Sequence, residues 1–184
     1  MSLTAPNYSP LPLALNDLNT GRKGCITAKW GGGLAQAAAV CLEEQGHASP
    51  KEIRISGDFE CPGRLEWSVP TEQSRRCWND DGYATEHGAY GIAALLVEHC
   101  GLEVVQRSKK KTGFDFWLGS ASDNAALFQG LTRLEVSGIR SSDDSTINMR
   151  VKQKLKQTNP SDGKLPAIVV VVEFGNPIAK IVEK

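Results

Sequence analysis

Long hydrophobic runs and an excess of one charge are both missing from this sequence of 184 residues. No apolar run is longer than Ala167–Val172, which has the length of a strand, so no transmembrane helix is expected. The first residues show no charged region followed by an apolar one, so no signal peptide is predicted. Basic and acidic residues number 21 each, so the overall charge indicates no class of partner.

Paired cysteine motifs are missing too. The five cysteines, at positions 25, 41, 61, 77 and 100, form no CxxC pair and are odd in number. This pattern predicts neither a disulfide framework nor a zinc ribbon, and it favours reduced thiols in the cytoplasm. Neither GxGxxG nor GxxxxGK(S/T) occurs, so the Gly31–Gly33 run does not indicate a phosphate-binding loop. A GxSxG elbow is also missing, so covalent serine chemistry is not indicated.

The composition is that of a globular protein with a buried core. Hydrophobic residues make up 40% of the chain and charged residues 23%, which excludes fibrous, wholly disordered and disulfide-dense small proteins. We expect a single domain over residues 1–184. Residues 1–100 hold 8 basic and 12 acidic residues, a net charge of −4, whereas residues 101–184 hold 13 and 9, a net charge of +4. The basic half favours a polyanionic partner, although scattered solvated charge explains the counts equally well.

The first half predicts mixed structure rather than one repeated element. Its expected elements are an arm (1–22), a short strand (23–30), a helix (34–45), two strands of a hairpin (53–59 and 65–69) and a polar connection (70–82). Pro62-Gly63 suits the centre of a type II turn between the two strands. Trp78, in the connection, is expected to be a packing anchor.

The second half has a sharper pattern. Its expected elements are a helix (84–100), strands (102–108, 114–118 and 132–139), a helix (146–158) and strands (167–174 and 177–182). The continuous apolar strand 167–174 is typical of a strand buried on both faces. Ile147, Val151 and Leu155 form the buried stripe of the second helix. The order helix, strand, strand, strand, helix, strand predicts a mixed α/β sheet flanked by helices.

Three acidic residues lie where an unpaired carboxylate is costly. Asp115 lies between apolar neighbours in GFDFWLG, Glu135 lies in LEVSG, and Glu86 lies near the start of its helix. Two acids on adjacent strands, with a third from a helix end, favour a divalent-cation site, because Mg²⁺ binds carboxylate and carbonyl oxygens. Simpler explanations stay open for the strand acids: Asp115 would face solvent on an edge strand, and Glu135 would pair with Arg133 or Arg150.

The order of these elements and acids over residues 83–174 resembles the PD-(D/E)XK nuclease superfamily. The resemblance implies a restriction-endonuclease-like core with αβββαβ order over residues 83–184, and residues 1–82 as an N-terminal helix and hairpin elaboration. It also implies Asp115, Glu135 and the carbonyl of Val136 as ligands of Mg²⁺ or Mn²⁺, with Glu86 as the helix acid. Hydrolysis of DNA phosphodiesters is the implied activity.

The sequence departs from this family at its lysine, because Ser137 stands at that position. We place Ser137 in the predicted catalytic set and expect a replacement cation from the next helix, with Lys152 as the first choice and Lys154 as another, or from Lys109–Lys111. Gln153 and Gln157 are further residues that could line the site.

The partner implied by the resemblance is nucleic acid, with DNA as the expected form. The predicted phosphate contacts come from two basic segments and are Arg107, Lys109, Lys110, Lys111 and Lys154. A homodimer is compatible with the family, and no membrane partner is expected. The alternative is a catalytically inactive nuclease-fold protein that binds nucleic acid or a protein partner.

Overall fold

The computed structural model describes residues 3, 10–120, 130–159 and 165–184. The strands are β1 (Leu11–Ala14), β2 (Lys51–Gly57), β3 (Cys61–Glu66), β4 (Leu102–Arg107), β5 (Phe116–Ser120), β6 (Thr132–Ile139), β7 (Ala167–Glu173) and β8 (Ile178–Glu183). The helices are η1 (Leu15–Thr20, a 3-10 helix), α1 (Ala28–Glu44), α2 (Glu72–Cys77), α3 (Asp81–His99) and α4 (Asp144–Gln157).

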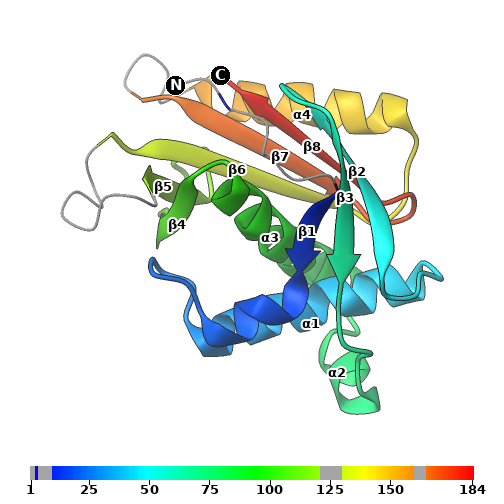
Figure 1. The fold of residues 1–184 in the computed structure, drawn as a ribbon. Helices are drawn as coiled ribbons and strands as arrows, with labels where there is room; N and C mark the ends of the chain where they lie inside the picture. The colour runs from blue at the N-terminus through cyan, green and yellow to red at the C-terminus, as the bar shows by residue number, and fades with distance from the viewer. Residues whose placement is uncertain (1–2, 4–9, 121–129, 160–164) are drawn as a thin grey trace.

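All eight strands form one curled, mixed sheet in the order β1-β3-β2-β8-β7-β6-β5-β4, with helices on both of its faces (Figure 1). The predicted mixed α/β class is therefore confirmed. Strand β2 pairs in parallel with β8, so elements of the first 82 residues extend the same sheet as the second half. Most of the predicted arm before Pro10 and the loop segments 121–129 and 160–164 lie outside the described residues.

The predicted order of the second half is confirmed over α3, β4, β5, β6, α4 and β7. Strands β4, β5 and β6 pair antiparallel in sequence, and β7 then joins β6 in parallel after the α4 crossover. The bounds of β6 are those predicted. This arrangement puts β6 between an antiparallel and a parallel neighbour.

Strand β7 is buried on both faces, which explains its unbroken apolar sequence. Ile168, Val170 and Val172 pack in the large core with α1 and α3. Val169 and Val171 pack in a smaller cluster with Ile147 and Val151 of α4. Figure 1 shows the same layers, with α4 over one face of the sheet and α1 and α3 over the other.

The expectations for the first 30 residues are wrong in two places. The end of the predicted arm forms β1 and η1, and β1 pairs with β3. The segment predicted as a strand, 23–30, leads instead into α1, which begins at Ala28. Thr27 caps this helix, because its hydroxyl accepts a hydrogen bond of 3.3 Å from the Trp30 amide.

The predicted helix 34–45 begins after Gly31–Gly33, but these three glycines lie inside α1. Gly31 packs against η1 so tightly that a Cβ atom there would lie 2.1 Å from the carbonyl oxygen of Leu18. At Gly33, the nearest atom to such a Cβ would be the Cζ2 of Trp78 at 3.6 Å, an ordinary contact. Close approach of the backbone at Gly31 therefore explains a glycine within a helix.

These two glycines give a matched pair of alanine substitutions. We expect Gly31→Ala to lower the free energy of unfolding by at least about 2 kcal/mol, because the backbone must move to admit the methyl group. Gly33→Ala should raise it by up to about 1 kcal/mol, since alanine favours the helix. Chemical denaturation of both variants measures the difference, and equal effects would contradict the packing described for Gly31.

The hairpin is confirmed, but its predicted turn is misplaced. The chain reverses over residues 58–60, and Pro62 and Gly63 lie within β3. A Cβ at Gly63 would lie within 2.9 Å of side-chain atoms of Ile53 and Ile55, so close packing rather than a turn explains this glycine. The polar connection contains α2, and Trp78 after it is buried, as expected of a packing anchor.

Two further expectations concern membrane-spanning helices and the oxidation state of the cysteines. Across the described part of the chain, no helix is long and apolar enough to cross a lipid bilayer. All five cysteines are free thiols.

Candidate functional site

The site lies where β5 separates from β6. The paired residues of β5 and β6 run from Thr132 to Leu134 of β6, and the amide of Asp115 donates to the carbonyl of Leu134 at 2.8 Å. Beyond that point β6 continues to pair with β7 on its other edge. The edge of β6 from Glu135 onward is thereby opened, and a cavity of about 480 Å³ lies there.

Asp115 is held at this opening by β6 itself. It was expected inside a strand, but β5 begins at Phe116, so Asp115 immediately precedes it. Its Oδ2 accepts a hydrogen bond of 2.9 Å from the amide of Val136. Because the amide and carbonyl of one strand residue point to the same side, the Val136 carbonyl also points toward the opening.

Glu135 is almost fully buried and lies next to Asp115. Its side chain is 2% exposed, and the Asp115 carboxyl group lies close enough to raise its pKa. The ammonium of Lys154, on α4, lies 2.5 Å from Oε1 of Glu135. Oε2 of Glu135 is buried without a hydrogen-bond partner among the described residues.

This environment changes the acidity of both carboxyl groups. Burial, and then the negative charge of Asp115, raises the pKa of Glu135 to about 7 despite the opposing effect of Lys154. Burial also raises the pKa of Asp115, although its bond from the Val136 amide opposes this. Two neighbouring carboxyl groups that resist simultaneous ionisation form a site that a proton or a cation would stabilise.

Helix α3 brings the third predicted acid to the rim of the cavity. Gly138 of β6 permits this approach, because a Cβ there would lie 2.3 Å from the carbonyl oxygen of Thr85. Glu86 is exposed, and the hydroxyl of Tyr90 donates to its Oε1 at 2.5 Å and lies 3.2 Å from Oδ1 of Asp115. Glu86 is therefore connected to Asp115 through Tyr90 rather than by direct contact.

Helix α4 supplies two cations to the opposite side of the cavity. Arg150 donates to the hydroxyl of Ser137 at 2.9 Å, and Lys154 contacts both Glu135 and Oε1 of Gln157. All five of these residues line the cavity. An arginine therefore lies against Ser137, and a lysine lies one helical turn further along α4.

The remaining predicted residues lie away from the acids. Lys152 is exposed on α4, and the described lining of the cavity includes Lys154 but does not include Lys152. Lys109, Lys110 and Lys111 are exposed in the turn between β4 and β5. Among the suggested alternatives, Gln157 lines the cavity whereas Gln153 is exposed outside it.

Arg107 lies near the site but contacts aromatic rings rather than the acids. Its guanidinium carbon lies 5.3 Å from the ring centres of both Tyr90 and Phe116 and 5.9 Å from that of Trp30. Such cation–π contacts hold a guanidinium in place while its N–H groups stay available to other acceptors.

The alternative ion pairs considered for Glu135 do not form. Arg133 is buried and donates to the carbonyl oxygens of Thr158 and Leu165 at 2.8 and 2.6 Å. Arg150 instead contacts Ser137. Glu135 therefore has Lys154 as its cationic partner.

The described residues at the opening supply only part of the ligand set that a small hard cation needs. No group of three or more histidine, cysteine, aspartate or glutamate side chains within the described ranges is placed to hold a metal ion. However, Mg²⁺ is commonly held by one or two carboxylates together with water and substrate phosphate. Two adjacent carboxyl groups, one with a buried unbonded oxygen, and a nearby carbonyl meet that smaller requirement.

Two residues of this site were not singled out from the sequence. Tyr90 was missed because an aromatic residue on the inner face of a helix is usually core; its spacing of four residues from Glu86 is the only sequence feature that links them. The sequence presents Arg150 as a candidate partner of Glu135 and as part of a basic segment that could contact phosphates, but nothing in the sequence links it to Ser137. The spacing of four residues between Arg150 and Lys154 puts both on one side of α4.

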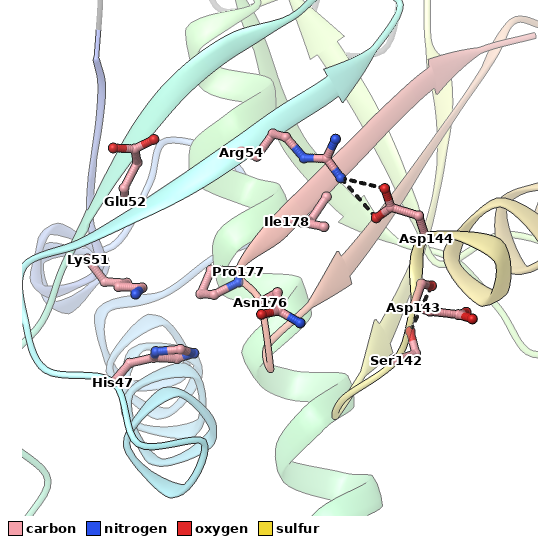
Figure 2. A pocket seen from close by; sticks show the side chains of 10 residues that line it. All are labelled: His47, Lys51, Glu52, Arg54, Ser142, Asp143, Asp144, Asn176, Pro177 and Ile178. Carbon is pink, nitrogen blue, oxygen red and sulfur yellow. Dashed lines mark hydrogen bonds and ion pairs between the residues drawn. The ribbon is translucent and has the colours of Figure 1, made fainter.

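A second cavity, of about 580 Å³, lies between β2 and the start of α4 (Figure 2). Figure 2 shows Arg54 and Asp144 pointing toward one another across it, with donor–acceptor distances of 2.9 and 3.1 Å. Asp143 caps α4 by accepting from the Thr146 amide at 2.8 Å. Arg54 and Asp144 thus already neutralise one another and Asp143 stabilises the helix, so we assign the function to the opening beside β6.

No protein-family model, curated protein or solved structure matches this chain, so the geometry at the opening between β5 and β6 is the basis for assigning a function.

Proposed function

We propose that the protein is a divalent-metal-dependent nuclease of the restriction-endonuclease-like type that hydrolyses DNA. The observation that carries this proposal is the position of Lys154. Its ammonium lies 2.5 Å from Glu135, beside Asp115, and so supplies from α4 the positive charge that Ser137 does not supply from β6. The order of α3, β4, β5, β6, α4 and β7 around these residues also supports it.

Each residue at the opening has a role in this proposal. Asp115, Glu135 and the Val136 carbonyl would hold Mg²⁺ or Mn²⁺. When bound, that cation polarises a phosphate oxygen and lowers the pKa of a water molecule. The Lys154 ammonium would stabilise the negative charge that develops on the phosphate oxygens as the water oxygen bonds to phosphorus and the ester P–O bond breaks.

The surrounding groups would position the substrate. Tyr90 is held as a hydrogen-bond donor, because burial and then its bond to Glu86 raise its pKa well above the usual range. Its hydroxyl holds the carboxyl groups of Glu86 and Asp115 in fixed positions relative to one another. Arg150, which lines the cavity, and Arg107, which contacts the Tyr90 ring, would bind phosphates near the cleaved bond.

Cleavage assays test this proposal. We expect the wild type to cleave plasmid or single-stranded DNA with Mg²⁺ or Mn²⁺ and to lose this activity with a chelator. Asp115→Asn should lower the rate by at least about a hundredfold, whereas the exposed Asp17→Asn should not change it. DNA binding without cleavage in the wild type would favour the inactive alternative, and cleavage unaffected by Asp115→Asn would contradict the assigned site.

A further inference from the structure

A row of aromatic side chains leads from the surface to the acids of the site. The ring centres of Trp78 and Tyr83 are 5.5 Å apart and stacked at 19°. Those of Tyr83 and His87 are 4.0 Å apart, and those of His87 and Tyr90 are 5.7 Å apart. The row ends at the Tyr90 hydroxyl, which contacts Glu86.

Tyr83 opens this row to solvent, whereas Trp78 behind it is buried. Tyr83 is 53% exposed, and the other large hydrophobic side chains exposed in the described ranges are Val69 and Met149. Tyr83, His87 and Tyr90 are spaced by four and three residues, so they share one side of α3. That side adjoins Gly82 and Glu86, both of which line the cavity.

Beyond Tyr90, the row meets a fixed positive charge. The Arg107 guanidinium lies 5.3 Å from the Tyr90 ring centre. A nucleic-acid strand carries phosphates at regular intervals with bases between them, so stacking rings that lead to an acidic site, with a guanidinium next to the last ring, match such a strand. Only a base that is released from its own stack and pair can contact the face of a protein ring.

We infer that the substrate is single-stranded DNA, or the single-stranded arm of a DNA junction, with an unpaired base stacked on Tyr83 and His87. This inference rests on the proposed nuclease function and names its substrate class. Tyr83 and His87 form the stacking platform, and Trp78 supports it from beneath. The scissile phosphate lies at Asp115 and Glu135.

Binding measurements without cleavage test the platform. Fluorescence anisotropy with a labelled 20-nucleotide oligothymidine and a labelled duplex hairpin, in Ca²⁺ instead of Mg²⁺, gives both affinities. We expect the wild type to bind the single strand at least tenfold more tightly than the duplex. Tyr83→Leu, which keeps an apolar contact with Trp78, should lose about tenfold of single-strand affinity, whereas Tyr83→Phe should keep it.

Met149→Ala, which removes another exposed apolar side chain, is the matched control and should bind as the wild type does. Equal wild-type affinities for strand and duplex, or an unchanged Tyr83→Leu, would overturn the inference even if the protein cleaves DNA. Tyr83-dependent binding of the single strand in a protein that cleaves nothing would support the platform while the hydrolytic function fails.

Discussion

Lys154→Met should lower the rate of metal-dependent DNA cleavage by at least about a hundredfold. Removing one group that stabilises developing charge in a water-poor site usually costs two to three orders of magnitude in rate. The Lys154 side chain is 21% exposed and its ammonium lies 2.5 Å from Glu135, so it is the cation nearest the paired acids among the described contacts. Methionine keeps much of the side-chain volume while it removes the charge.

Lys152→Met is the matched control for this substitution. Lys152 lies on the same helix but is exposed, so its replacement should change the rate by less than about threefold. Single-turnover cleavage by the two variants makes the comparison. A larger loss of rate from Lys152→Met than from Lys154→Met would support Lys152 as the replacement cation, as the sequence predicts, and would contradict the role of Lys154.

Glu135→Gln should abolish cleavage and yet make the protein more stable at pH 8. Glu135 has a pKa of about 7 in the folded protein and an ordinary value of 4.5. A shift of this size corresponds to a stabilisation on the order of 3 kcal/mol when the ionised carboxylate is replaced by a neutral amide. Thermal unfolding with a chelator present should show a midpoint roughly 5 to 10 °C higher at pH 8.

The pH dependence of this effect has a definite sign. Between pH 4.5 and 7 the unfolded chain loses the Glu135 proton while the folded protein retains it. The folded state then binds more protons, so the wild type becomes less stable as the pH rises through this window. The advantage of Glu135→Gln should therefore be near zero at pH 4.5, grow up to about pH 7 and stay constant above it.

Glu173→Gln provides a control with the opposite sign. Glu173 is as buried as Glu135, but its carboxylate accepts backbone hydrogen bonds from Ser142, Gly175 and Asn176 at 3.2, 2.7 and 2.8 Å. An amide group presents a donor where one of these acceptors was, so we expect destabilisation of about 1 to 3 kcal/mol. If Glu135→Gln also destabilised the protein at pH 8, Glu135 would be a structural ion-pair residue.

The sheet of the second half was predictable because its pattern and its environment agree. Strand β7 has apolar residues suited to burial on both faces, and the neighbouring elements provide that burial. The first third of the chain was harder to predict, because some of its glycine residues are required by close packing and do not mark turns. Gly31 contacts Leu18, and Gly63 contacts Ile53, across pairs of residues at least ten positions apart, so neither role is visible in the local sequence.

Asp115 and Glu135 could be predicted as site residues because an unpaired carboxylate in an apolar segment is costly. Choosing Lys154 over Lys152 required knowledge of which side of α4 faces the acids. At about 100° per residue, Lys154 borders the stripe of Ile147, Val151 and Leu155 on the side of Arg150, whereas Lys152 lies beyond the other border. In the structure, the border that carries Arg150 and Lys154 faces Glu135 and Ser137. Which border faces the acids depends on how α4 packs on β6, and the sequence pattern does not determine it.

Binding of a divalent cation to Asp115 and Glu135 is the central claim, and calorimetric titration tests it directly. We expect Mn²⁺ and Mg²⁺ to bind the wild type at one site at pH 8, more weakly at pH 6 because the carboxyl groups must lose protons, and not at all to an Asp115→Ala/Glu135→Ala variant that remains folded. If the wild type binds neither cation at pH 8, or if the double variant binds as well as the wild type, the two acids do not form a metal site.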